Sequence, residues 1–376
     1  MVYLFYSFIS FLISLFFILY PPTYTEPDHG KTVSLEDAFR QEIHQMLPIK
    51  HHHYRYSNNT TQVTISFAGD CTLGYDDTFS YMHSFPQVLE IQNNHYGYFF
   101  EKVQTLFERD DLTLVNLETT FTNATRKANK KYRFKGPPEY VQVLTEGSIE
   151  MVNVSNNHIY DYLQEGFEDT IKTLEDAGIY YSGEDHMAIY EAKGIKIASL
   201  GYGGWNDSIR NSLEKDIKKA REAADMVIVS FHWGQERSYY PNNTQIYLGR
   251  LSIDLGADVV IGHHPHVIQG IEKYKDKHII YSLGNFSFGG NKNPSDQDTF
   301  IFQNTFYFRN KTLVRNEGKI IPCSISSVKI GNNYQPVILE DQERDRVLSR
   351  IDEYSRRLQY GIDIYDKNSP FPARVN

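Results

Sequence analysis

Six short apolar runs in this chain stop on or beside residues that bind metals or move protons. The runs are VTISFAGD (63–70), LTLVNLE (112–118), MVNVSNNH (151–158), MVIVSFHW (226–233), VVIGHHPH (259–266) and IIYSLGNF (279–286). Buried strands of α/β folds deliver the side chains at their carboxyl ends into one crevice. The pattern therefore predicts that polar residues far apart in the sequence meet in one pocket, and a bound metal is the most economical reason for it.

Segments with helical periodicity separate these runs. Residues 165–178 carry an apolar stripe and finish at Gly178, and residues 244–258 close in the same way on Gly256. The aromatic, alternating stretch 299–310 predicts antiparallel strands at a sheet edge. Helices that alternate with buried strands favour an α/β sandwich with the helices outside and ligands at the strand ends.

The amino-terminal run 2–20 contains no charged residue. As a helix rising about 1.5 Å per residue it spans roughly the 30 Å hydrocarbon core of a bilayer. It lacks the basic start and the A-x-A-like end of a secretory signal, so residues 1–20 are predicted to be a membrane anchor, with a cleaved signal as the alternative. The expected localisation is a single-pass protein of the cell membrane whose main domain is extracytoplasmic.

The remaining chain divides by composition. Residues 21–60 are rich in Pro, Thr, His and Asn and are predicted to be a tether with one helical stretch at 34–47. Residues 61–330 form the expected main domain. Residues 331–376 are a predicted helical extension, in which the charged segment 338–359 packs a thin apolar stripe on the domain surface.

Charge and cysteine content exclude two classes of function. The formal net charge is −9, so there is no global basic footprint for nucleic acid. One dense basic segment, Arg126–Lys135, could attract a carboxylate or phosphate polymer, or could be a solvated loop. Cys71 and Cys323 are too far apart in sequence for a zinc motif; they form either one disulfide or two buried thiols.

The candidate ligands are oxygens and imidazoles without thiolates, which suits manganese, iron or zinc and leaves room for one or two ions. The metal-binding candidates are Asp70, Glu118, Asn157, His232, His264 and His266. Alternation in an extended His264-Pro265-His266 segment puts the two imidazoles on one side and points His263 the other way. Taken singly, such residues are often turn acids or half-buried histidines.

Two further residues are candidates for proton transfer. His158 follows Asn157 directly and is free to donate a proton to a leaving group. Asp161 lies three residues later, where it either orients the His158 imidazole or serves as an acidic residue at a helix amino terminus.

The motifs GDCTLG, VNLETTFT, RFKGPPEYVQVL, NVSNNHIYDY, SFHWGQE, GADVVIGHHPHVIQGIE and IIYSLGNFSF together resemble the CapA, or PGA_cap, capsule-synthesis family. The resemblance implies a four-layer α/β/β/α sandwich of the calcineurin-like metallophosphoesterase type, holding two metals. By that likeness the six ligand candidates match metal-binding positions and His158 matches the catalytic histidine of an Asn-His motif. The Asp-x-His motif of classical phosphoesterases is missing, because Cys71 and Thr72 follow Asp70.

The resemblance also implies a function. It predicts a membrane-anchored, metal-dependent hydrolase-like protein in the synthesis, release or export of a surface polymer such as poly-γ-glutamate, cleaving an amide or a phosphoester. Asn116, Arg133, Lys135 and Asn285 are the expected substrate contacts. The alternative is a non-catalytic assembly or export subunit that keeps the fold and binds other polymer synthase subunits.

Overall fold

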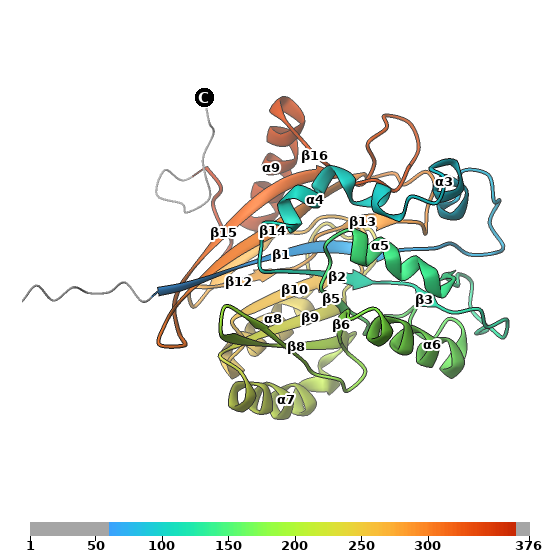
Figure 1. Cartoon of the computed structure of the whole chain (residues 1–376). Coiled ribbons are helices and arrows are strands. Elements are labelled where there is room, and N and C mark those ends of the chain that lie inside the picture. The colour runs from blue at the N-terminus through green and yellow to red at the C-terminus, as the bar shows by residue number, and fades with distance from the viewer. Residues whose placement is uncertain (1–59, 366–376) are drawn as a thin grey trace, which may run out of the picture. The chain divides into compact units, whose positions relative to one another are not determined.

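The computed structural model describes residues 60–365 (Figure 1). The predicted anchor, nearly all of the predicted tether and the helical stretch 34–47 lie outside these residues. No helix within residues 60–365 combines the length and the apolar character that a membrane crossing needs.

The first of two large sheets has a parallel half and an antiparallel half. Its strands, in spatial order, are β16 (Val337–Ile338), β15 (Thr312–Ser324), β14 (Asp298–Arg309), β1 (Thr60–Thr72), β2 (Leu112–Leu117), β5 (Met151–Asn153) and β6 (Tyr180–Ser182), with β13 (Asn285–Phe288) also paired to β1. Strands β1, β2, β5, β6 and β13 run parallel, whereas β14, β15 and β16 are antiparallel. The antiparallel pairing predicted for 299–310 is thereby confirmed, but β14 lies third from the sheet edge, because β15 and β16 add outside it.

The second large sheet is parallel at its centre and antiparallel at both edges. Its order is β11 (Ile271–Tyr274), β12 (Lys277–Ile280), β10 (Val259–His263), β9 (Met226–Trp233), β8 (Ile195–Gly204) and β7 (Ala188–Ala192). A separate pair joins β3 (Thr120–Phe121) to β4 (Lys135–Gly136). All eight residues of β9 are buried, as expected for a parallel strand covered on both faces.

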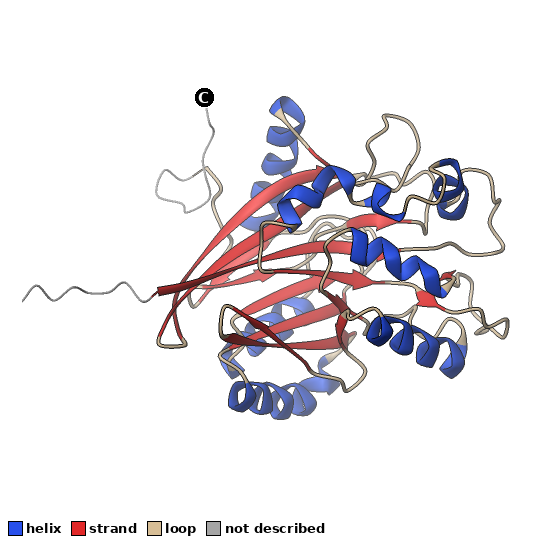
Figure 2. Cartoon of the chain, viewed as in Figure 1, coloured by secondary structure: helices blue, strands red, loops and turns tan. Residues whose placement is uncertain are grey.

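Helices cover the outer faces of both sheets (Figure 2). Those beside the first sheet are α3 (Phe85–Ile91), α4 (Glu101–Phe107), α5 (Val141–Glu146) and α6 (Leu163–Asp176); those beside the second are α7 (Arg210–Ala223) and α8 (Asn243–Leu255); α9 (Asp341–Arg356) packs at β15 and β11. Short 3-10 turns are η1 (Tyr96–Phe99), η2 (Pro138–Tyr140) and η3 (Asp207–Ile209). The predicted helix ends hold: Gly178 and Gly256 follow α6 and α8 with φ of 72° and 121°.

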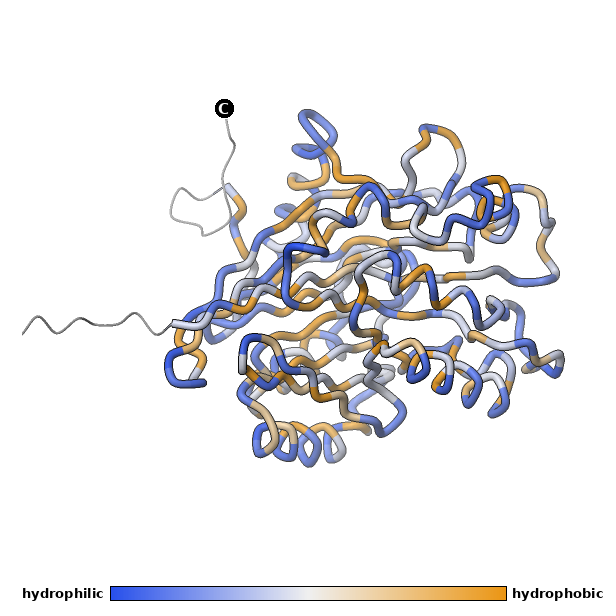
Figure 3. Tube along the Cα trace, viewed as in Figure 1, coloured by the Kyte–Doolittle hydropathy of each residue, from blue (hydrophilic) through white to orange (hydrophobic). Residues whose placement is uncertain are grey.

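Three buried hydrophobic clusters lie between the four layers of helices and sheets. One cluster fills the space between the sheets, where Phe67 and Leu114 of the first meet Ile197 and Ile261 of the second. The other two lie between each sheet and its own helices. Figure 3 shows the hydrophobic residues gathered along the strands and hydrophilic ones on the outer turns of α7. These layers form the α/β/β/α sandwich that the resemblance implies.

The carboxyl-terminal segment is tied into the sandwich. β16 pairs with β15, and Val347 and Ile351 of α9 are fully buried in the cluster between the sheets. The helix spans Asp341–Arg356 and is shorter than the predicted 338–359; it starts later because Ile338 pairs in β16 and Glu340 is extended. Cys71 and Cys323 are both free and buried, which decides between the two alternatives for the cysteines.

Candidate metal centre

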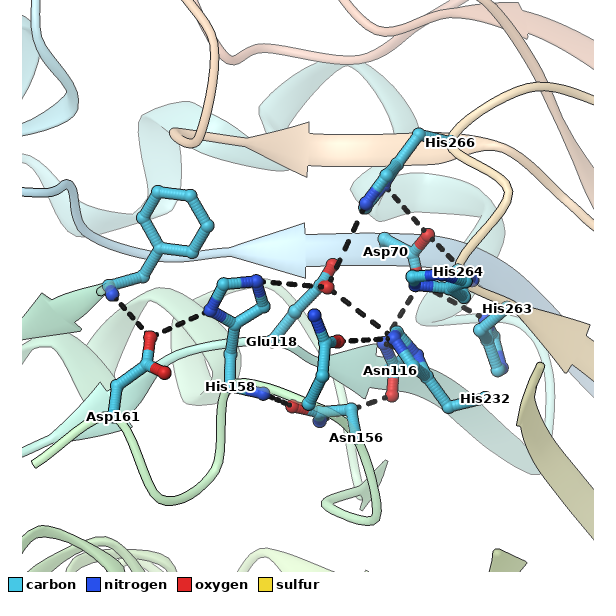
Figure 4. Close-up of polar contacts among 12 residues, drawn as sticks. Asp70, Asn116, Glu118, Asn156, His158, Asp161, His232, His263, His264 and His266 are labelled. Atoms are coloured by element: carbon cyan, nitrogen blue, oxygen red, sulfur yellow. Dashed lines mark hydrogen bonds and ion pairs between the residues drawn. The ribbon is translucent and has the colours of Figure 1, made fainter. Parts of the chain in front are cut away.

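The carboxyl ends of strands from both sheets meet at one point, and the predicted polar residues gather there (Figure 4). Asp70 lies near the end of β1, Glu118 follows β2, Asn157 and His158 follow β5, His232 lies in β9, and His264 and His266 follow β10. Residues nearly 200 positions apart therefore lie in one cluster, as the strand ends predicted. Each of the two sheets contributes residues to it.

Close backbone packing holds the strand ends together. The Asp70 amide donates to the Gly284 carbonyl over 3.0 Å, and the Glu118 amide donates to the Cys71 carbonyl over 2.9 Å. A Cβ atom at Gly69 would stand 2.0 Å from the Gly284 oxygen, so only glycine fits at this position. The two acidic residues therefore sit on a tightly fixed backbone.

Asp70 is fully buried and has several partners. It accepts hydrogen bonds from Asn116 Nδ2 at 2.8 Å and from the His264 amide at 3.2 Å. Its oxygens also lie 3.3 Å from His266 Nδ1 and 3.6 Å from His263 Nδ1. Burial opposes the charge of Asp70, but the hydrogen bond and charge of His266 and the nearby imidazoles outweigh it and hold its pKa below the usual range.

Glu118 is the least satisfied group in the cluster. It is fully buried, and neither carboxylate oxygen has a hydrogen-bond donor within residues 60–365. Its Oε1 faces three imidazoles instead, 3.5 Å from His232 Nε2 and 3.8 Å from both His266 Nε2 and His158 Nε2. A buried carboxylate without donors is costly unless a cation neutralises it, so this environment suits a positive ion.

Ligand atoms of Glu118, His264 and His266 all lie within 4.8 Å of one another. Burial lowers the pKa of His264 to about 4, which leaves a neutral imidazole with a free electron pair. Burial opposes the charge of His266, yet the charges of Glu118 and Asp70 raise its pKa to about 10. The negative potential at this point attracts a proton, and it would attract a divalent cation for the same reason.

His232 and Asn157 extend the donor set on the side of β9. Their Nε2 and Oδ1 atoms lie 2.7 Å apart, while Asn116 Nδ2 lies 3.3 Å from His232 Nδ1. Burial holds the pKa of His232 well below its usual value, so it is neutral. These neutral nitrogen and oxygen donors, with two carboxylates, fit manganese, iron or zinc.

His158 lies on the opposite side of Glu118 and is held by Asp161. Its Nδ1 is 2.7 Å from Asp161 Oδ2, and Asp161 also accepts from Lys130 Nζ and the Phe134 amide, both at 2.6 Å. The His158 ring packs against the Phe134 ring, with the centroids 4.5 Å apart and the planes tilted by 39°. The imidazole is thus fixed in orientation, with Nε2 turned to the cluster.

A pocket of about 390 Å³ opens beside this histidine. His158, His266 and Asn285 form its inner end, and Asn285 Oδ1 lies 2.8 Å from His266 Nδ1. Its walls are made by four aromatic residues, by Glu236 and Arg237 of the loop after β9, and by the loop that follows β13; the aromatic residues are Phe79, Tyr132, Phe134 and Phe288. A substrate in the pocket would touch the cluster from this side.

The two predicted basic contacts lie elsewhere. Lys135 Nζ donates to the Ala124 carbonyl at 2.8 Å and stands over the Tyr162 ring, and Arg133 uses its backbone amide to bind Asp76. Neither residue lines the pocket. Much of the basic segment is already engaged in ion pairs, including Lys127 with Asp77.

The extended geometry predicted for residues 264–266 is wrong. His264 and His266 have φ of 95° and 56°, so the chain leaves β10 through left-handed conformations. His263 is paired in register with His232 and points into the cluster rather than away from it. Register between neighbouring strands, which places paired side chains on the same face, would have revealed this.

Three other residues at the site escaped the sequence reasoning. Asn156 binds the His158 amide through Oδ1 and the Leu117 carbonyl through Nδ2. Lys130 holds Asp161, as described above. Trp205, which is 48% exposed, stands edge-on to His264 with the rings 4.7 Å apart. A loop asparagine or an exposed tryptophan carries no periodic signal that would single it out.

Comparisons with known proteins identify relatives whose names refer to capsule or PGA biosynthesis. The capsule biosynthesis protein CapA of Bacillus anthracis is 30% identical over 279 residues, covering 66% of this chain and 64% of that protein. The PGA biosynthesis protein CapA of Bacillus subtilis strain 168 is 34% identical over 213 residues, covering 50% and 56%. The chain therefore spans less than two thirds of the length of these relatives.

Solved structures also match parts of the fold. A hypothetical protein from Thermus thermophilus aligns with a TM-score of 0.43 and 16% identity, covering 69% of this chain and 99% of that one. A 5′-nucleotidase from Candida albicans aligns with a TM-score of 0.36 and 12% identity, covering 79% and 59%.

A family model bears directly on the cluster. It is described as bacterial capsule synthesis protein PGA_cap and matches residues 64–290, more than half of the chain. The matched range contains every residue of the polar cluster, from Asp70 to Asn285. The chain therefore belongs to the PGA_cap family of bacterial capsule synthesis proteins.

Proposed function

We propose that this chain is a metal-dependent hydrolase that acts on an anionic polymer during capsule or poly-γ-glutamate biosynthesis. The observation that carries the proposal is the buried Glu118 carboxylate, which finds no hydrogen-bond donor in the described part of the chain and faces a cluster of imidazoles. Family membership supplies the biosynthetic setting, and the printed names of the Bacillus relatives supply the polymer.

Glu118, His264 and His266 would hold the ion, with Asp70, Asn157 and His232 close enough to complete one site or to hold a second ion. When bound, a divalent metal polarises an ester or amide oxygen and favours the deprotonation of water near neutral pH. Both phosphoester and amide hydrolysis need that chemistry.

His158 is the residue placed to move a proton. Its Nδ1–H donates to Asp161, so Nε2 faces the pocket and can take a proton from an attacking water and return it to the leaving group. Asp161, itself paired with Lys130, stabilises the protonated imidazole. Asn156 Oδ1 accepts a hydrogen bond from the His158 amide at 2.9 Å and so fixes the backbone there.

We further infer that residues 1–20 anchor the protein in the cell membrane with the hydrolase domain outside the cytoplasm, where a surface polymer is found. The charge-free run 2–20 supports this placement. Protease added to intact cells should digest the domain, and membrane washing at high salt should not release it. Release of the protein by salt alone would contradict the anchor.

The function is tested on the purified full chain. Its metal content is measured first, and hydrolysis of poly-γ-glutamate and of a generic phosphodiester is then followed with manganese, iron or zinc. Cleavage of either substrate that disappears on chelation and returns with metal is the expected result. A chain that binds metal yet cleaves neither, while its deletion still stops polymer production in cells, would instead be a non-catalytic assembly or export subunit.

A further inference from the structure

Two loops make the outer wall of the pocket beside His158, and both are tied to α9. The first is the loop 234–242 after β9, which carries Glu236 and Arg237. The second is the loop 289–297 between β13 and β14, whose residues 290–296 line the pocket. Helix α9 lies beyond residue 290, where the family model ends.

Arg350 of α9 holds the second loop by a two-pronged contact. Its Nη1 and Nη2 donate to the two carboxylate oxygens of Asp296 at 3.0 and 2.6 Å. The same guanidinium pairs with Asp298 at the start of β14. Paired hydrogen bonds of this kind fix direction as well as distance, so the end of the loop has one geometry.

Arg350 also meets the first loop. The Tyr239 hydroxyl interacts electrostatically with the Asp296 carboxylate, and the Arg350 guanidinium stands 5.3 Å from the Tyr239 ring and 5.8 Å from the Tyr354 ring. Next to it, Tyr240 donates to Glu353 of α9 at 3.2 Å. One side chain of α9 therefore joins both loops of the pocket wall.

The joined loops carry the pocket's available positive charge. Arg237 is exposed and lines the pocket, and its backbone amide is fixed to the Pro265 carbonyl at 2.8 Å, directly between His264 and His266. Lys292, across the pocket, is occupied by the carbonyls of Ser80 and Met82. Among the described lysines and arginines that line the pocket, Arg237 is the one whose side chain has no partner, so its guanidinium can meet an anionic substrate group.

We propose that Arg350 is a positioning residue for substrate: it locks the two loops through Asp296 and Tyr239 so that Arg237 faces a carboxylate or phosphate group of a substrate whose scissile bond lies at the metal cluster. This proposal rests on the hydrolase function proposed above. It makes α9 part of the substrate site although α9 touches none of the candidate metal ligands.

Arg346 provides a matched control. It lies one helical turn before Arg350 and donates to Asp298 at 2.6 and 2.7 Å, but it has no contact with Asp296 or Tyr239 among those described. Arg350→Met and Arg346→Met each remove one guanidinium from Asp298 and leave the other. Only Arg350→Met frees the pocket loops.

The first measurement is hydrogen exchange on the full chain, which needs no substrate. Arg350→Met should speed exchange in 235–240 and 293–297, whereas Gly289 stays protected because its amide donates to the Thr72 carbonyl at 2.8 Å. Arg346→Met should leave both segments as in the unchanged protein. Equal exchange in the two variants would overturn the proposal. Tyr239→Phe, which keeps every ion pair, should speed exchange in 235–240 alone. It replaces Arg350→Met as the test variant if Arg350→Met folds poorly.

The second measurement is the kinetics of poly-γ-glutamate and phosphodiester cleavage. Arg350→Met should raise KM about 10–100-fold with kcat nearly unchanged, because it displaces a binding group and not the reacting ones. Arg237→Gln should raise KM similarly only for the substrate whose anionic group Arg237 binds, which distinguishes carboxylate from phosphate. Equal effects of Arg346→Met, or a loss confined to kcat, would contradict the proposal. If the unchanged protein cleaves neither substrate, the hydrolase function fails, and exchange alone decides whether Arg350 locks the loops.

Discussion

Nδ1 of His158 lies 2.7 Å from Oδ2 of Asp161, so the imidazole cannot turn away from the pocket without breaking a buried contact. Under the proposed function, this pairing would keep the proton-transfer residue separate from the metal-binding residues of the same cluster. His158 is close to Glu118 but is not among the three residues whose ligand atoms converge most tightly. The two roles should therefore respond differently to substitution.

His158→Ala should lower turnover by about 10²–10⁴-fold, the usual worth of a general acid or base, while metal content stays close to that of the unchanged protein. His264→Ala should instead lower metal content. Metal analysis and initial rates on the same samples check both statements. His95→Ala, an exposed histidine at the start of η1 that does not line the pocket, should change neither, and loss of metal from His158→Ala would show that His158 is a ligand.

Glu118→Gln should have opposite effects with and without metal. In the metal-free protein burial raises the pKa of Glu118, and the substitution removes a buried carboxyl group that finds no donor among residues 60–365, so the melting temperature should stay level or rise. With metal present, the unchanged protein gains the binding free energy and the variant gains much less, so the order should reverse. Melting curves with and without a chelator test this, and Glu236→Gln, an exposed carboxylate of the pocket, should show no reversal.

Trp205 should report metal binding directly. It is exposed and stands 4.7 Å from the His264 ring, whereas Trp233, the other tryptophan of the chain, is fully buried. Manganese is paramagnetic and should quench Trp205 emission as it binds. Titration of Trp205→Phe should show almost no quenching although metal analysis still finds the ion. Full quenching in that variant would place the ion nearer to Trp233.

Asp110, which lies far from the cluster, should make the free energy of unfolding depend on pH. Burial raises its pKa to about 7, against the hydrogen bonds from Ser66 and Thr113. A raised folded-state pKa means that ionisation costs folding free energy above pH 7, and the cost falls as pH drops toward the unfolded value near 4. Allowing for its partial exposure, the advantage of Asp110→Asn over the unchanged protein should shrink by about 1–2 kcal/mol between pH 8 and pH 5.

Urea unfolding of the full chain at several pH values measures this difference. Thr113 still finds an acceptor in the asparagine, so the substitution changes charge and little else. Asp176→Asn, on the exposed side of α6, is the control and should give curves parallel to those of the unchanged protein. A constant difference for Asp110→Asn across the range would show that the carboxyl titrates normally.

Strand ends were sufficient to predict most of the cluster. Asp70, Glu118 and His232 lie where buried runs stop, and parallel strands leave little freedom in what those positions face. The geometry after β10 was not predictable in this way, because left-handed residues at His264 and His266 break the alternation on which the argument depended. Lys135 was misleading for a related reason: its pairing in β4 directs the ammonium to Ala124 and Tyr162.

The contacts that hold the pocket wall could not be predicted from the sequence. Arg350 and Asp296 are 54 positions apart, and nothing in a charged amphipathic helix distinguishes the arginine that holds a loop from the one that does not. Only packing against Tyr239 and Tyr354 distinguishes the arginine that holds the loop. Contacts of this kind depend on tertiary structure, which local periodicity does not encode.

The division of the cluster between two sheets sets an order of events during biogenesis. Glu118 follows a strand of the first sheet, and His264 and His266 follow a strand of the second, so the ligands converge only after the sheets have docked. An ion held by these residues could therefore not nucleate folding as it does in a zinc finger, where ligands lie close in sequence. It would bind last, to a scaffold that has already folded. A cell starved of metal should accumulate a folded protein that can be switched on later, without new synthesis, when the ion becomes available.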